Sequence, residues 1–169
     1  MGILIIDDQE WTITKLRELL GGKGIETDYT STLEDSLDQL GEEAYDALII
    51  DYDMDVLNGE QLIRLIKGEY IVDGETKTLD DDITYDEIKE SDSEIAGVFE
   101  KYFIGMENYK EFVSRFKDTT FILFSGNSAE LEQAKLPSDV FVVYKNNDSD
   151  NYSAERKIID YLIEQRALK

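Results

Sequence analysis

Residues 45–59 read YDALIIDYDMDVLNG, and this stretch decides the fold. A short apolar run, Ala47–Ile50, stops at an acidic residue, Asp51, and the turn signal Asn58-Gly59 follows it. Apolar residues at helical spacing come next along the chain. A uniformly apolar strand that leads through a turn into a helix is typical of a parallel sheet with helices on both faces.

The same arrangement recurs outward in both directions. Further strands are expected at Ile3–Ile6, Ile25–Tyr29, Phe121–Phe124 and Val140–Tyr144. Helices are expected near Glu10–Leu20, Thr32–Leu40, 62–66, Glu130–Lys135 and Tyr152–Leu168. The order predicts an α/β fold, a doubly wound five-stranded parallel sheet, in a single domain that spans residues 1–169.

Residues 68–118 break this pattern. They hold 15 acidic and 6 basic residues. Their first part is polar, and we expect a turn at Asp73-Gly74 and a solvated acidic run at Asp80–Asp82. From 95 to 116, apolar side chains recur every three or four residues, which predicts one long helix, or two separated near Gly105, packed as core. We interpret the 68–118 segment as an acidic, partly helical insertion between the third helix and the fourth strand.

Composition excludes several classes of function. The 169 residues include 17 basic and 39 acidic side chains, a net charge of −22, which disfavours binding to nucleic acids and to anionic membranes. The absence of Cys and His excludes disulfide scaffolds, Cys/His zinc sites and His-based triads. No apolar run is long enough for a membrane span, and the N-terminus lacks the features of a signal peptide, so we expect a cytoplasmic protein.

Chemically useful side chains follow four of the predicted strands. Because the carboxyl ends of parallel strands share one edge, we expect these side chains to lie on one rim. They are Asp7, Asp8, Asp51, Ser125 and Lys145. A divalent cation, best Mg²⁺, would relieve the repulsion among the acids. Asp51 could then attack a phosphorus atom, with Lys145 and Ser125 contacting the phosphoryl oxygens and Gly126 leaving their approach open.

This set of motifs resembles the receiver domain of bacterial response regulators, over about residues 1–67 and 119–169. The paired acids match as Asp7-Asp8, the switch hydroxyl with its small neighbour as Ser125-Gly126, and the lysine as Lys145. Residues 51–59 follow the family pattern Asp-x-x-Met-Pro-x-x-x-Gly, with Asp55 in place of Pro. Two further positions depart from the family: Asn146 replaces the usual Pro, and Val142 replaces the usual aromatic residue.

The resemblance implies a role for each matched residue. Asp51 would be the phosphoacceptor, and Asp8 and Asp51 would ligate Mg²⁺ directly, with Asp7 acting through water and the backbone carbonyl of Asp53 as a third protein ligand. The side chains of Asp53 and Asn127 would tune the lifetime of the phosphoryl group, and Ser125, Gly126 and Lys145 would contact it.

The expected function is a phosphorylation-dependent switch of a two-component or phosphorelay system. The resemblance implies a sensor histidine kinase or a phosphotransfer protein as phosphodonor. Because no further domain follows the last helix, output is expected through contact with an unknown downstream protein, for which residues 68–118 are the candidate surface. The protein is expected to be a monomer or a homodimer. The domain would catalyse only its own phosphorylation and dephosphorylation.

Two other interpretations stay open at this point. Asp51-x-Asp53, Ser125 and Lys145 also resemble haloacid-dehalogenase-type phosphatases, with Asp51 as nucleophile, Asp53 as acid and residues 68–118 as a cap. That family needs a further acidic motif on a strand after the lysine, and here Asp148 and Asp150 follow at once without one. The third interpretation is a pseudo-receiver that docks a partner without being phosphorylated.

Overall fold

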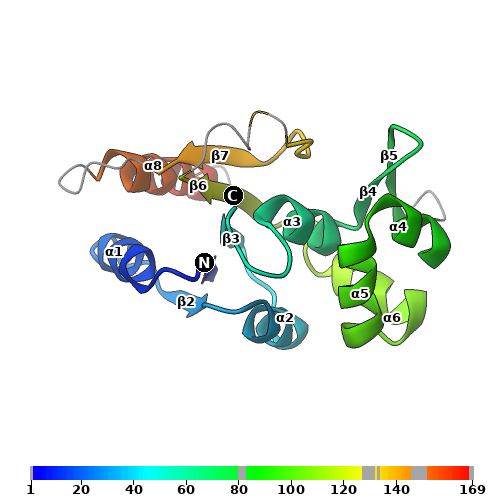
Figure 1. The fold of residues 1–169 in the computed structure, drawn as a ribbon. Helices are drawn as coiled ribbons and strands as arrows, with labels where there is room; N and C mark the ends of the chain where they lie inside the picture. Colours follow the sequence, from blue (N-terminus) through cyan, green and yellow to red (C-terminus); the bar gives the residue numbers. More distant parts are fainter. Residues whose placement is uncertain (1, 80–82, 127–131, 133, 146–151, 168–169) are drawn as a thin grey trace.

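The computed structural model of the chain describes residues 2–79, 83–126, 132, 134–145 and 152–167. At its centre lies a five-stranded sheet in the order β2-β1-β3-β6-β7, with every neighbouring pair parallel (Figure 1). Its strands are β1 (Ile3–Ile6), β2 (Thr27–Thr30), β3 (Ala47–Asp51), β6 (Thr120–Ser125) and β7 (Phe141–Tyr144). The predicted sheet is confirmed. Only β2 differs by more than one residue at either end, because it begins at Thr27 instead of Ile25. This edge strand has few apolar residues to mark its position.

Helices cover both faces of the sheet, and further helices form in the 68–118 segment. They are α1 (Glu10–Gly21), α2 (Leu33–Glu42), α3 (Gly59–Lys67), α4 (Tyr85–Ser91), α5 (Ser93–Tyr102), α6 (Gly105–Ser114) and α8 (Ser153–Ala167). The predicted cap of the second helix is present, because the Thr32 side chain accepts a hydrogen bond from the Asp35 amide. Most of the helix predicted at Glu130–Lys135 falls outside the described residues. In the described part of the chain, no helix combines the length and the hydropathy that a membrane crossing needs.

Alternating side chains of the strands face two helical layers. Ile3 and Ile5 of β1 belong to the core beneath α1 and α8, whereas Leu4 and Ile6 belong to the core beneath α2 and α3. Strands β3 and β6 alternate in the same way, and their side chains are buried on both faces. Complete burial explains why these strands have uniformly apolar sequences. It also fixes their register, because a slip of one residue would exchange the two faces.

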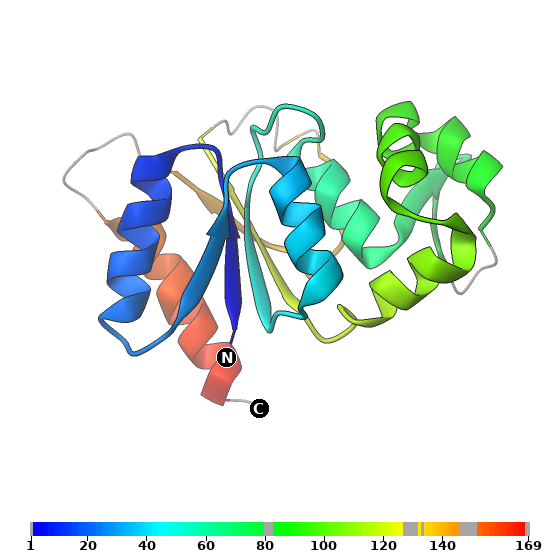
Figure 2. The same ribbon diagram turned by 90° about the horizontal axis from the view of Figure 1, so that it is seen from below.

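The 68–118 segment lies beyond α3, at the opposite end of the molecule from α1 and α8 (Figure 2). It begins with an antiparallel hairpin of β4 (Glu69–Val72) and β5 (Glu75–Thr78), which turns at Asp73-Gly74 as predicted. The helical part is divided into α5 and α6, and Gly105 has a positive φ of 80°, so the alternative with two helices is correct. Its aromatic side chains pack on one another and join the core under α3, as predicted.

Candidate functional site

The carboxyl ends of the strands bring the predicted side chains together. Asp7 and Asp8 follow β1, Asp51 is the last residue of β3, and Ser125 is the last residue of β6. Lys145 follows β7, and its backbone amide donates a 2.6 Å hydrogen bond to the carbonyl of Ser125. Because these strands are parallel neighbours, their ends form one rim, as the sequence predicts.

Three acids form a compact cluster on this rim. One carboxylate oxygen from each of Asp7, Asp8 and Asp51 lies within 4.8 Å of the other two. Asp7 and Asp51 are buried, with 2% and 1% of their surface exposed, whereas Asp8 is exposed. Three carboxylates this close repel one another when all are ionised, so the cluster needs positive charge.

The Lys145 ammonium supplies part of that charge. Its Nζ lies 3.0 Å from Asp7 Oδ2 and 2.9 Å from Asp51 Oδ1, and its side chain is nearly buried. Burial raises the pKa of Asp7 from 3.8 to about 6, and Lys145 opposes that rise. Burial raises the pKa of Asp51 as well, against Lys145 and the backbone amide of Asp53. A single lysine therefore does not compensate fully for two buried carboxyls.

The cluster fits a hard divalent cation. Its donors are all carboxylate oxygens, which Mg²⁺ prefers over nitrogen and sulfur ligands. Within the described residues, both oxygens of Asp51 are buried; Oδ1 shares the Lys145 ammonium with Asp7, and Oδ2 has no hydrogen-bond partner of standard geometry. A buried, charged oxygen without a partner is costly, and a metal ion would satisfy it. The exposed carboxylate of Asp8 leaves the cluster open to solvent on one side.

The other predicted residues lie at the same rim with different surroundings. Ser125 is fully buried, and Gly126 is exposed with open space where a Cβ would point. Asp53 is exposed in the loop between β3 and α3. Asn127, Asn146, Asp148 and Asp150 fall outside the described residues, so the predictions made for them stay predictions.

Sequence reasoning missed how tightly the start of α3 is built against Asp51. A Cβ on Gly59 would lie 2.5 Å from the backbone oxygen of Asp51 and 2.5 Å from Leu123 Cδ1, so only glycine fits. Asn58 and Gln61 form a reciprocal capping box at this helix start. The pattern Asn-x-x-Gln before an apolar helix was the available signal, but Asn58-Gly59 was interpreted only as a turn.

A cavity of about 600 Å³ opens beside the acid cluster. One wall comes from Asp8 and the loop residues Met54 and Val56, and the other from Val98 and Tyr102 of α5. Val56 is 59% exposed, a large fraction for an apolar side chain. The 68–118 segment therefore contributes to the surface next to the candidate site.

Comparisons with known proteins agree with this geometry. The sequence model of the response regulator receiver domain matches residues 3–77. No curated protein matches the chain significantly. Among solved structures, the chain resembles a sensor protein from Polaromonas, with 17% identity, coverage of 96% of this chain and 93% of that chain, and a TM-score of 0.55.

Two response regulators show the same fold. The Thermotoga maritima protein TrrA, solved in complex with Mg²⁺-BeF, is 21% identical, with coverage of 95% and 97% and a TM-score of 0.51. The chemotaxis response regulator CheY4 of Vibrio cholerae is 13% identical, with coverage of 95% and 97% and a TM-score of 0.51. The family model over residues 3–77 and the shared fold show that this chain resembles the response regulator receiver domain.

Proposed function

We propose that the chain is a signalling switch that accepts a phosphoryl group on Asp51 in the presence of Mg²⁺. The observation that carries the proposal is the buried carboxylate of Asp51, held 2.9 Å from the Lys145 ammonium and within 4.8 Å of two further acids. A lone buried aspartate would be unfavourable in a structural role, whereas a nucleophile for phosphoryl transfer needs this combination of acids and one lysine.

The chemistry follows from the side chains at the rim. An oxygen of Asp51 attacks the phosphorus of a phosphodonor, an acyl phosphate forms, and the bond from phosphorus to the donor atom breaks. Mg²⁺, when bound, neutralises charge on the transferring oxygens, and Asp7, Asp8, Asp51 and the carbonyl of Asp53 are the residues that would hold it. Lys145 and the hydroxyl of Ser125 then contact the phosphoryl oxygens, while Asp53 and Asn127 border them and set the lifetime.

Partners and output follow from the same assignment. Receiver domains accept phosphate from histidine kinases or phosphotransfer proteins, so one of these is the proposed donor, in the cytoplasm. The proposed activity is self-phosphorylation and self-dephosphorylation, with no external substrate. We also propose that residues 68–118 are an insertion within a single domain and that they help to choose the downstream partner. The cavity between Asp8 and α5 supports that role. Unchanged partner binding after deletion of residues 69–117 would contradict it.

Intact mass spectrometry tests the proposed phosphoryl transfer. The chain is incubated with acetyl phosphate, with Mg²⁺ or with EDTA, beside the variant Asp51→Asn. We expect one phosphoryl adduct that needs both Mg²⁺ and Asp51. Release of phosphate over many turnovers, dependent on Asp51 but without an adduct, would instead indicate a haloacid-dehalogenase-type phosphatase. No adduct from either acetyl phosphate or a panel of phosphorylated histidine kinases would indicate a docking module.

A further inference from the structure

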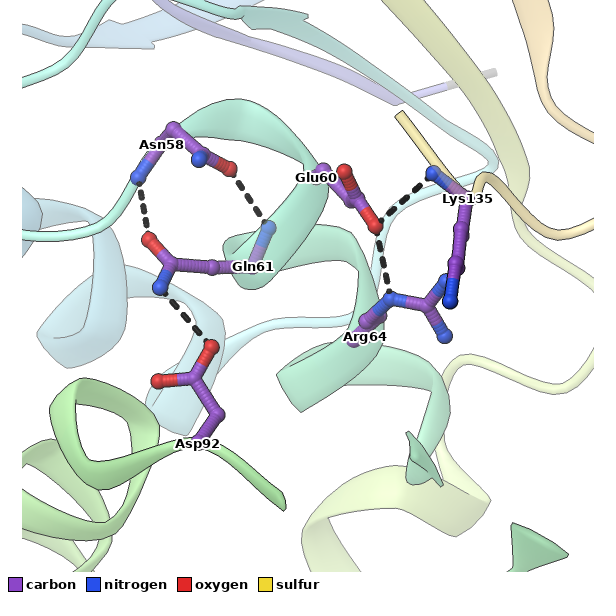
Figure 3. Close-up of polar contacts among 6 residues, drawn as sticks. All are labelled: Asn58, Glu60, Gln61, Arg64, Asp92 and Lys135. Atoms are coloured by element: carbon purple, nitrogen blue, oxygen red, sulfur yellow. Dashed lines mark hydrogen bonds and ion pairs between the residues drawn. The ribbon is translucent and has the colours of Figure 1, made fainter. Parts of the chain in front are cut away.

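The first turn of α3 contacts three separate parts of the molecule. Gly59 packs against the backbone of Asp51, and its amide donates a 2.9 Å hydrogen bond to the carbonyl of Tyr52. Glu60 accepts a 3.1 Å hydrogen bond from the backbone amide of Lys135, in the segment that leads to β7 (Figure 3). The third contact is made by Gln61 and reaches the 68–118 segment.

The Gln61 side chain uses both ends of its amide. Its Oε1 accepts a 3.0 Å hydrogen bond from the Asn58 amide, which completes the capping box of α3. Its Nε2 donates to Asp92 Oδ2 at 2.8 Å (Figure 3) and also to Glu94 Oε2 at 2.8 Å. One side chain thus connects the loop that starts at Asp51 with residues more than 30 positions further along the chain.

Asp92 holds a structural position of its own. Its Oδ1 accepts hydrogen bonds from the amides of Glu94 and Ile95 and so caps the start of α5. Its backbone amide donates to the carbonyl of Ile88 and closes the last turn of α4. The Gln61 contact therefore reaches the junction of two helices, where a small displacement would reorient α5 relative to α3.

The loop between Asp51 and Asn58 has little freedom to absorb a change at Asp51. Gly59 fixes its far end against the backbone oxygen of Asp51, and Leu57 is buried within the loop region. A phosphoryl group on Asp51 adds negative charge and acceptor oxygens at the start of this loop. A displacement of the loop therefore passes to Asn58, and through the capping box to Gln61.

We propose that Gln61 is a positioning residue that couples the phosphorylation state of Asp51 to the orientation of α5 in the 68–118 segment. The inference rests on the proposed function, because it needs a phosphoryl group on Asp51. Coupling between two sites is reciprocal, so a partner that binds α5 shifts the phosphorylation equilibrium of Asp51 by the same factor. Binding of a partner to the 68–118 segment then alters phosphorylation of Asp51, just as phosphorylation of Asp51 alters this segment.

Exchanging the hydrogen-bond donor and acceptor between residues 61 and 92 distinguishes this coupling from an effect on helix stability alone. Gln61→Glu keeps a carboxylate oxygen for the Asn58 amide, so the capping box survives, but it places negative charge against Asp92. Asp92→Asn keeps one oxygen to cap α5 and turns the other atom into a donor that faces the Gln61 donor. In the double variant, the new amide can donate to the new carboxylate, and the exposed side chain of Glu94 can rotate away.

Hydrogen–deuterium exchange on the full chain measures the coupling, with Mg²⁺ and beryllofluoride as a phosphoryl mimic. In the wild type we expect the exchange rate of α5 amides to change by about threefold or more when the mimic binds. We expect either single variant to lose most of this change while keeping the change in the loop 52–57, and the double variant to regain it. Gln39→Glu, the same substitution on α2, is the matched control and is expected to behave as the wild type.

The outcomes distinguish this inference from the proposed function. If the mimic binds and alters the loop, but α5 does not respond in the wild type or still responds fully in both single variants, the coupling is contradicted and the proposed function stands. If the mimic leaves the exchange of the loop 52–57 unchanged, and mass spectrometry shows no adduct in the wild type from acetyl phosphate or from phosphorylated histidine kinases, the proposed function fails and the inference fails with it.

Discussion

Replacing Asp7 by Asn is expected to stabilise the metal-free protein. Burial raises the pKa of Asp7 from 3.8 to about 6, so the folded carboxyl holds its proton more tightly than the unfolded one. The stability that this proton provides is present at acid pH and is lost as the pH rises from about 4 to about 6. A tenfold change in proton affinity corresponds to about 1.4 kcal/mol, so ionising Asp7 at pH 8 costs up to about 3 kcal/mol.

The substitution removes this cost, although it also removes the 3.0 Å ion pair of Asp7 with Lys145. An Asn oxygen can still accept the 2.8 Å hydrogen bond from the Gln9 amide, and Lys145 keeps its ion pair with Asp51. In EDTA, urea unfolding should show the variant more stable than the wild type by up to about 3 kcal/mol at pH 8 and by roughly half as much at pH 5. Asp8→Asn, at the exposed member of the cluster, is the control and should have a small effect.

Mg²⁺ should narrow the difference. A cation that binds only the folded wild type adds about 2.7 kcal/mol at a concentration of 100 times its dissociation constant, and the variant should gain less because it has lost a charged oxygen. The reasoning would be refuted by a variant that is less stable than the wild type at pH 8 without metal. That result would mean that Asp7 is compensated by Lys145 alone.

Three further substitutions probe the rim and the packing behind it. Lys145→Ala should permit phosphorylation of Asp51 but abolish the structural response. In EDTA it should lower the free energy of unfolding by about 3 kcal/mol, because two buried carboxyls lose their partner. Hydrogen-exchange rates and a urea midpoint equal to those of the wild type would contradict this. Gly59→Ala should cost about 2 kcal/mol in urea unfolding, because its Cβ would overlap the backbone of Asp51; a neutral effect would show that the loop can yield. Tyr109→Phe should cost about 1–3 kcal/mol, because the buried hydroxyl donates a 2.6 Å hydrogen bond to the carbonyl of Leu65; Tyr29→Phe, at an exposed position, is its control.

The sheet and its acidic rim could be predicted from the sequence for a simple reason. Strands buried on both faces are uniformly apolar, so Ile3–Ile6 and Ala47–Ile50 stand out, and the rule that parallel strands end at one edge then places the following residues together. Asp7, Asp8, Asp51 and Lys145 meet as predicted. The pairing of Lys145 with both buried acids could not be predicted, because it depends on distances across three strands.

The 68–118 segment was harder to interpret, and the reason is its edge strand. The four residues of β5, Glu75–Thr78, are polar or charged and carry no apolar alternation, so the strand was not expected. It forms because its backbone pairs with β4, where Tyr70 and Val72 are buried. The contact between Gln61 and Asp92 was also out of reach, because no local pattern reports a hydrogen bond between residues 31 positions apart.

Locating the phosphoryl group is the most direct test of the central claim. After incubation with Mg²⁺ and acetyl phosphate, borohydride reduces an aspartyl phosphate to homoserine, which peptide sequencing by mass spectrometry can identify. We predict homoserine at residue 51 in the wild type and at no residue in Asp51→Asn. Homoserine at Asp7, Asp8 or Asp53 in place of Asp51, or stable phosphorylation of a hydroxyl that borohydride does not reduce, would contradict the account.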